Sequence, residues 1–297
     1  MADIKLFNIA GEVKELPGSS VTLEKELQHI IETNMVTFFG VRFLTSEYST
    51  TNGGRMDSIG IDENNCPVIF EYKRHQDENV INQGLFYLNW LLDHKDSFKV
   101  LVIDRLGMKA ASSIDWSMPR IICIAGDFTK YDESAIKEMN RNISLIRYKK
   151  FGKDLLMFEH LNENIVKAIE VDEPTTKKKG SDKTFDEQLA GAEKHIKALY
   201  DELSDYITHL GDDVSENRLK LYVAFKKIKN FACVVVIKSK IILELQLDPA
   251  TVTFEEGFSR DVTHIGHWGT GNVEVEIKSA QDFEKAKALI ERAYNGL

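Results

Sequence analysis

Cysteine, proline and long apolar stretches are scarce in this 297-residue chain. Its three cysteines are odd in number and far apart, which argues against a disulfide framework and favours a reducing compartment such as the cytoplasm. No apolar run approaches the roughly 18 residues that a membrane helix needs. The N-terminus also lacks the basic start and apolar core of a signal peptide. The sequence therefore predicts a cytoplasmic protein without a membrane segment.

Positive charge is in deficit, since the net charge is −9 at pH 7. This balance disfavours a simple nucleic-acid coat protein, which is normally basic. A nuclease stays compatible with it, because an active site built from carboxylates is itself acidic and the local charge matters more than the total.

A linker is indicated at residues 171–183, VDEPTTKKKGSDK, which hold a proline, a glycine and a lysine run and almost nothing that a core would bury. Thr184 and Glu187 then form a capping box, which predicts a helix that runs to about Leu210. We therefore expect one domain at 1–170 and a second, smaller domain at 184–297.

Apolar periodicity predicts a mixed α/β first domain. Its expected elements are a helix from about Leu23, strands near 54–62 and 67–74, a helix near 79–93, and buried strands at 99–104 and 120–125. In the second domain the expected elements are strands at 219–225, 231–237 and 241–247 and a closing helix near 281–294. The second domain is therefore expected to be α+β.

Charged side chains stand at the ends of two apolar strands in GGRMDSIGIDENNCPVIFEYKR, residues 53–74. Because side chains alternate along a strand, Glu71 and Lys73 share one face. The polar turn at 62–67 folds the preceding strand back, so Asp57 converges on Glu71. Such charges are costly to bury unless they are paired or bind a metal. Two converging carboxylates suit Mg²⁺ or Mn²⁺, and with a lysine they form the minimum equipment for phosphodiester hydrolysis.

This pattern resembles the PD-(D/E)XK nuclease superfamily. Asp57 is followed, after 13 residues, by the tripeptide EYK at 71–73. Gln83 and Tyr87 match the QxxxY element of the RecB-like and Mrr-like branches and share one helix face. Met56 stands where the superfamily usually has a proline, as in other divergent members.

A longer resemblance covers most of the chain. Residues 53–74, 79–91 and 260–277 are similar to those of a bacterial family related to the NucS and RecB-type nucleases. Members of that family join a nuclease-like domain to a C-terminal domain of unknown function. The resemblance implies a restriction-endonuclease-like mixed sheet flanked by helices and a divalent-metal-dependent nuclease, acting on DNA rather than RNA, in defence or DNA repair.

The same resemblance implies roles for individual residues. Asp57 and Glu71 would bind the metal, Lys73 would position the attacking water, and Gln83 and Tyr87 would support the site.

The superfamily often adds a carboxylate from the helix before the active strands, where Glu24 and Glu26 are the candidates. At roughly 100° per residue, Glu24 lies about 65° and Glu26 about 95° from the centre of the apolar stripe on that helix. Glu24 is therefore expected to be the third metal ligand.

Ordinary roles stay open for these residues. Asp57, Glu71 and Lys73 also suit a surface salt-bridge cluster, Gln83 and Tyr87 suit half-buried packing, and a first-turn glutamate such as Glu24 suits the helix dipole. The rival function is a non-catalytic module that binds nucleic acid or protein and retains the nuclease fold.

Two groups of basic residues are candidates for contacts with the substrate backbone. Arg55 and Arg74 flank the active strands, and the planar guanidinium suits phosphate. Residues 139–153 hold five basic and no acidic residues interleaved with aromatics. The candidates within this segment are Arg147, Lys149 and Lys150. Solvated strand ends and a solvated face are the alternatives.

The loop at 261–271 combines His264, His267 and Trp268 with three glycines that let a backbone approach closely. These residues suit a ligand pocket, although a His-x-x-His spacing alone is a weak metal signal. A tight turn with a packed tryptophan is the alternative. The second domain is expected to select a substrate or partner, and the sequence allows a homodimer.

Overall fold

The computed structural model describes residues 4–77, 79–164 and 183–297, without the side chains of 162–164. Its contacts divide the chain into two units, residues 1–166 and 167–297, and each unit is described by itself. Residues 171–182 of the expected linker lie outside the described residues. None of the helices within the described ranges combines the length and the apolar character that a membrane crossing requires.

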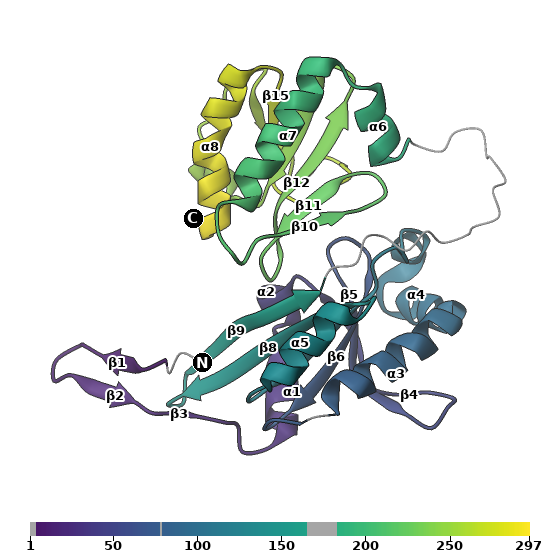
Figure 1. The fold of residues 1–297 in the computed structure, drawn as a ribbon, viewed down its shortest axis with the longest axis vertical. Coiled ribbons are helices and arrows are strands. Elements are labelled where there is room, and N and C mark those ends of the chain that lie inside the picture. The colour runs from purple at the N-terminus through teal and green to yellow at the C-terminus, as the bar shows by residue number, and fades with distance from the viewer. Residues whose placement is uncertain (1–3, 78, 165–182) are drawn as a thin grey trace. The chain divides into compact units, whose positions relative to one another are not determined.

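The first unit is built on a seven-stranded mixed sheet (Figure 1). Its strand order is β3-β8-β7-β6-β5-β4, and β9 also pairs with β8. The strands are β3 (Gly18–Ser19), β4 (Arg42–Ser49), β5 (Arg55–Ile61), β6 (Pro67–Lys73), β7 (Arg120–Ala125), β8 (Asn142–Phe151) and β9 (Leu155–Asn164). Neighbours are antiparallel from β4 to β6 and parallel from β6 to β8. A separate hairpin is formed by β1 (Leu6–Asn8) and β2 (Lys14–Leu16).

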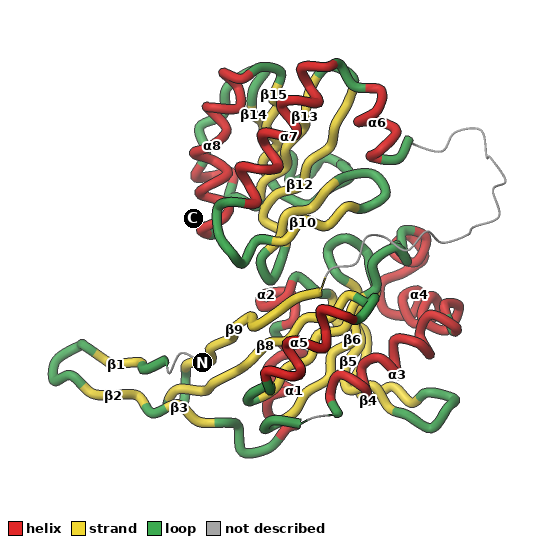
Figure 2. The backbone as a smooth tube through the Cα atoms, viewed as in Figure 1, coloured by secondary structure: helices red, strands yellow, loops and turns green. Residues whose placement is uncertain are grey.

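Helices cover both faces of this sheet (Figure 2). They are α1 (Glu24–Thr33), α2 (Met35–Phe39), α3 (Val80–Asp93), α4 (Lys95–Ser112) and α5 (Lys130–Glu138). Leu88, Val102 and Ile136, from α3, α4 and α5, join the buried cluster that includes Ile69 of β6. On the other face Phe39 of α2 packs 5.4 Å from Phe70, measured between ring centroids. Because β6 is covered on both faces, its sequence is continuously apolar up to the charged residues at its end.

The second unit holds a six-stranded antiparallel sheet in the order β10-β11-β12-β13-β15-β14. Its strands are β10 (Ser215–Arg218), β11 (Val223–Lys226), β12 (Asn230–Ile237), β13 (Lys240–Leu245), β14 (Ser259–Asp261) and β15 (Val273–Ile277). Its helices are α6 (Phe185–Gly191), α7 (Lys194–Thr208), the short 3₁₀ helix η1 (Pro249–Thr251) and α8 (Ala280–Asn295). Side chains of α7 and α8 pack on one face of the sheet.

The expected fold class is confirmed: a mixed α/β unit with helices on both faces of a mixed sheet, followed by a smaller α+β unit. The strands expected near 54–62, 67–74 and 120–125 are β5, β6 and β7, and the helix expected near 79–93 is α3.

Three details of the expected secondary structure are wrong. Residues 99–104 belong to α4 and do not form a strand, because a short apolar run also fits the buried side of a helix. The helix expected at 184–210 is interrupted near Ala192, whose ψ of 155° is extended. Strands β4, β8 and β9 were not expected at all.

Candidate active site

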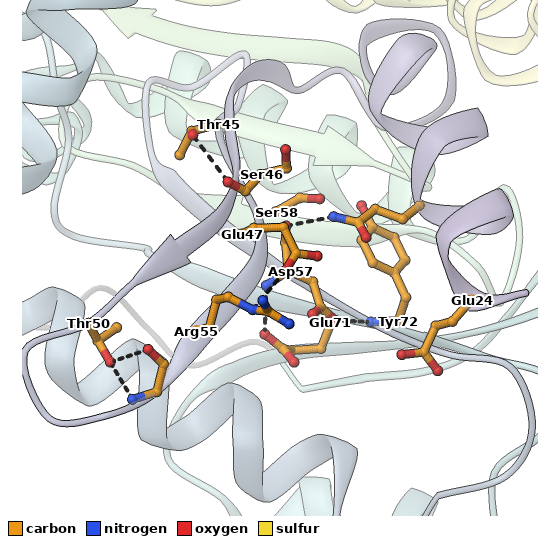
Figure 3. Close-up of polar contacts among 12 residues, drawn as sticks. Glu24, Thr45, Ser46, Glu47, Thr50, Arg55, Asp57, Ser58, Glu71 and Tyr72 are labelled. Carbon is orange, nitrogen blue, oxygen red and sulfur yellow. Dashed lines mark hydrogen bonds and ion pairs between the residues drawn. The ribbon is translucent and has the colours of Figure 1, made fainter.

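Asp57 and Glu71 lie on neighbouring antiparallel strands (Figure 3). The β5–β6 ladder pairs Ser58 with Phe70, so the next residues outward, Asp57 and Glu71, face each other. The backbone N–H of Tyr72 donates to Asp57 Oδ2 at 2.9 Å, and the backbone N–H of Asp57 points to Glu71 Oε1 at 3.4 Å. The structure therefore brings together the two carboxylates that the sequence singled out.

Burial gives this pair an unusual electrostatic state. Glu71 is only 2% exposed. Burial, and then the charge of Asp57, raise the pKa of Glu71 to about 9. Burial also raises the pKa of Asp57, against the opposing effects of the Tyr72 N–H and Lys73. The site thus holds more carboxylate than nearby positive charge, which favours the binding of a cation.

Lys73 and Glu24 meet at the carboxyl end of β6. Lys73 Nζ lies 3.9 Å from Glu24 Oε1, and the backbone N–H of Arg74 donates to Glu24 Oε2 at 3.1 Å. Glu26, the other candidate, instead pairs with Lys150 at 2.6 Å. The structure therefore places Glu24, and not Glu26, beside the active strand.

Glu47 is a site residue that the sequence analysis missed. It lies on β4 between the ladder pairs Ser46–Ser58 and Tyr48–Met56, and therefore opposite Asp57. Its φ of 55° is unusual for a residue other than glycine. Its carboxylate lies 2.7 Å from Arg55 Nε and adds to the negative potential at Asp57 (Figure 3). If residues 42–49 had been predicted as a strand paired with β5, Glu47 would have been recognised as a neighbour of Asp57.

Gln83 and Tyr87 lie on α3, which packs against β6 and β7. The Tyr87 hydroxyl accepts the backbone N–H of Arg55 at 3.3 Å and so fixes the start of β5. The amide oxygen Oε1 of Gln83 is buried, and no described residue donates a hydrogen bond to it. A buried acceptor of this kind is suited to a donor from water or substrate.

Most of the candidate basic side chains are already engaged. Arg55 pairs with Glu47, Arg147 with Asp127 and Glu159, and Lys150 with Glu26. Lys149 Nζ lies 5.7 Å from the centroid of the Phe151 ring. The backbone of Arg74 bonds to Glu24 and to the Tyr148 hydroxyl. Substrate contacts by these residues remain a prediction from the sequence.

A divalent ion fits the site only as a partly hydrated ion. In the part of the chain that the structure describes, no three His, Cys, Asp or Glu side chains are grouped so as to hold a metal ion. Mg²⁺ usually keeps several waters and binds to one or two carboxylates together with substrate phosphates. Asp57 and Glu71 match that donor set, and burial is the main cause that raises the pKa of each carboxyl.

The loop with His264, His267 and Trp268 is anchored to the second unit's sheet. The backbone N–H of Thr270 donates to Cys233 Sγ at 3.3 Å, and Asn230 Nδ2 donates to Thr270 Oγ1 at 3.2 Å. Trp268 is 42% exposed, so its ring is only partly packed. His267 Nδ1 lies 2.7 Å from the carbonyl oxygen of Ile265. The loop therefore displays these three side chains from a fixed base.

A buried pair of glutamates lies next to this loop in the second unit. Glu244 and Glu274 face each other across β13 and β15. Arg260 binds Glu274 through two hydrogen bonds, at 2.7 and 2.9 Å. Burial, and then Glu274, raise the pKa of Glu244 to about 8. A Cβ on Gly269 of the loop would lie 2.1 Å from Glu244 Oε2, so the loop packs closely on this buried carboxyl.

Residues 185–296 match a family model described as a domain of unknown function, DUF5655. An uncharacterized protein of Haemophilus influenzae is 28% identical over 292 residues, which cover 95% of this chain and 96% of that protein.

Two solved structures are weakly similar to this chain. A repair endonuclease from Pyrococcus abyssi matches with a TM-score of 0.29 and 18% identity, over 43% of this chain and 48% of that one. A complex of EndoMS with double-stranded DNA matches with a TM-score of 0.27 and 19% identity, over 43% of this chain and 47% of that one. Each match thus spans about half the length of the solved chain.

Proposed function

We propose that the first unit is a restriction-endonuclease-like nuclease that hydrolyses phosphodiester bonds in nucleic acid with Mg²⁺ or Mn²⁺. The observation that carries this proposal is the Asp57–Glu71 pair, two facing carboxylates on adjacent strands with Lys73 at the end of the same strand. The resemblance to the nuclease superfamily alone favours DNA over RNA, and a role in defence or DNA repair.

Each residue of the site has a role in this proposal. Asp57 and Glu71 bind the ion. Glu24, whose role as a third metal ligand stays a prediction from the sequence, lies near enough to Lys73 to hold its ammonium in place. The ion would neutralise charge on the phosphate and acidify the attacking water. Lys73 orients that water and adds positive charge as the transition state forms. The buried Gln83 Oε1 accepts a hydrogen bond from water or substrate.

Calorimetric titration with Mn²⁺ tests the metal site. We expect one binding site in the wild type, measured with and without a DNA oligonucleotide because substrate phosphates complete such sites. Asp57→Asn should remove it, since an amide is a poor ligand for a hard cation. Asp154→Asn, at an exposed position, is the matched control and should bind as the wild type does.

The same titration has an expected pH dependence. Ligands must lose their protons to bind a metal, and burial together with Asp57 raises the pKa of Glu71 to about 9. The Mn²⁺ affinity should therefore increase with pH, by roughly tenfold per unit while one proton is displaced. An affinity that does not change between about pH 6 and about pH 8 would show that Glu71 is not a ligand that must give up a proton.

A further inference from the structure

Contacts between side chains and backbone replace the regular pairing of β5 and β6 at the candidate active site. The ladder between these strands ends at the pair Ser58–Phe70. Beyond this pair, the backbone N–H of Tyr72 donates to Asp57 Oδ2 at 2.9 Å (Figure 3). The position of the Asp57 carboxylate therefore depends on what holds the backbone of Asp57, and not on the ladder alone.

Helix α1 holds this backbone through Gln28. The side-chain amide nitrogen of Gln28, Nε2, donates to the carbonyl oxygen of Asp57 at 2.9 Å, although the two residues lie 29 positions apart in the sequence. Gln28 is only 8% exposed, so little water competes for the bond. Among the residues that the structure describes, no other side chain donates to this carbonyl oxygen. The bond is therefore the main side-chain support for the backbone of Asp57.

The orientation of the Gln28 amide is itself fixed. Its Nε2 also donates to Glu32 Oε1 at 2.9 Å, one helical turn further along α1. Both partners are acceptors, so the amide must present its N–H groups, and not its oxygen, to Asp57. Glu32 Oε1 in turn accepts the hydroxyl of the fully buried Ser58 at 2.6 Å. Gln28 and Glu32 thus bind two successive residues of β5.

Packing of α1 on the sheet does not need this amide. Leu27 and Ile31 of the same helix are fully buried and supply its apolar contact. A buried amide costs free energy unless it is hydrogen-bonded, and an apolar side chain of similar length would avoid that cost. One of the two bonds that offset the cost goes to Asp57. A polar group at this position therefore indicates a role at Asp57 and not in the packing of the helix.

We infer that Gln28 is a positioning residue for Asp57. By holding the carbonyl oxygen, it keeps the Asp57 backbone in the place from which the carboxylate reaches the Tyr72 N–H. Residues that support a metal ligand without touching the metal typically change the metal affinity by roughly 10–100-fold when they are removed. The effect on a metal rests on the proposed function, whereas the effect on the position of Asp57 does not.

Amide hydrogen exchange in EDTA tests the effect on Asp57 without a metal. Gln28→Met keeps much of the length of the side chain but removes the donor. Because the Tyr72 N–H is bonded to Asp57 Oδ2, its exchange should become roughly tenfold faster, about the value of one hydrogen bond. The amides of Val68 and Ile69, inside the ladder, are the reference and should keep their rates. Equal acceleration of all three amides would show a general loss of stability and overturn the inference.

Calorimetric titration with Mn²⁺ tests the consequence for the metal site. The affinity of Gln28→Met should be roughly 10–100-fold weaker than that of the wild type. The Mn²⁺ concentration for half-maximal cleavage should increase by the same factor, whereas kcat at saturating Mn²⁺ should stay near the wild-type value. Thr33→Val is the matched control, because it also removes one hydrogen bond from α1, to the carbonyl oxygen of His29, but at an exposed position. This control should match the wild type in both experiments.

A second variant and the wild type separate the possible outcomes. Glu32→Met, at a partly exposed position, frees the Gln28 amide without altering a buried side chain, and should shift both measurements in the same direction by a smaller factor. If the wild type binds no Mn²⁺, the proposed function fails, and the exchange of Tyr72 still tests Gln28. Unchanged Tyr72 exchange in these two variants, or an unchanged affinity where the wild type does bind Mn²⁺, would overturn the role of Gln28.

Discussion

Replacing Lys73 by methionine should lower the rate of nucleic-acid cleavage by about 10²–10⁴-fold, the range found for positioned proton-transfer and charge-stabilising groups. Methionine keeps much of the length and packing of the side chain but removes the ammonium. The binding of Mn²⁺ should persist, because Asp57 and Glu71 stay in place. Binding of the oligonucleotide should persist as well, because Lys73 is expected to act in the transition state.

A matched control is available in the second unit. Lys240 is similarly shielded, with 25% of its side chain exposed, and it too pairs with a glutamate, Glu276. Lys240→Met should therefore lose an ion pair and keep full activity. If Lys73→Met cleaves at the wild-type rate, Lys73 has no part in the chemistry; if both variants lose activity, the effect is a general one of stability.

Replacing Glu71 by glutamine should stabilise the metal-free first unit. Burial and the neighbouring Asp57 raise the pKa of Glu71 to about 9, above its ordinary value of 4.5. One pKa unit corresponds to about 1.4 kcal/mol, and near pH 7 only the interval above 4.5 contributes, so after a discount for solvent screening the free energy of unfolding should increase by about 2–3 kcal/mol. For a unit of this size the melting temperature should increase by roughly 5–10 °C.

The sign of the pH dependence follows from the direction of the shift. Near and below pH 4.5 both the folded and the unfolded state hold the proton, and Glu71 costs little. Between that pH and about 9 the unfolded state releases the proton first, so the wild type loses stability as the pH increases. The advantage of Glu71→Gln should grow over this range and shrink when Mn²⁺ is added.

Urea titrations in EDTA, followed by tryptophan fluorescence, measure this effect, since two of the three tryptophans, Trp90 and Trp116, lie in the first unit. Glu138→Gln, at the exposed end of α5, is the control and should leave the midpoint unchanged. If Glu71→Gln is less stable than the wild type at every pH, the Glu71 carboxylate stabilises the fold. That result would contradict its interpretation as a ligand for a cation.

The sequence predicted the centre of the site because that centre depends on local structure. Asp62 Oδ1 accepts the backbone N–H groups of Asn64 and Cys66, each at 2.9 Å, and so closes the turn between β5 and β6. A turn of this length fixes the register, and the register places Asp57 opposite Glu71. Alternation along β6 then places Lys73 on the face of Glu71.

Other parts of the site depend on contacts that are distant in sequence. Glu47 faces Asp57 only because β4 pairs with β5, and its positive φ has no local signal in the sequence. Gln28 reaches the carbonyl oxygen of Asp57 only because α1 packs against β5. Residues 99–104 were misassigned because periodicity alone does not separate a short buried strand from the inner side of a helix.

Cleavage by the wild type and by Glu71→Gln, side by side, tests the central claim most directly. Both proteins are incubated with single-stranded, double-stranded and methylated DNA and with RNA oligonucleotides, in Mg²⁺ and in Mn²⁺. We expect the wild type to cut at least one of these substrates, EDTA to stop the reaction, and Glu71→Gln to be inactive on that substrate while folded. Undiminished cleavage by Glu71→Gln, or no cleavage of any substrate by the wild type, would contradict the assignment of Asp57, Glu71 and Lys73 as a nuclease site.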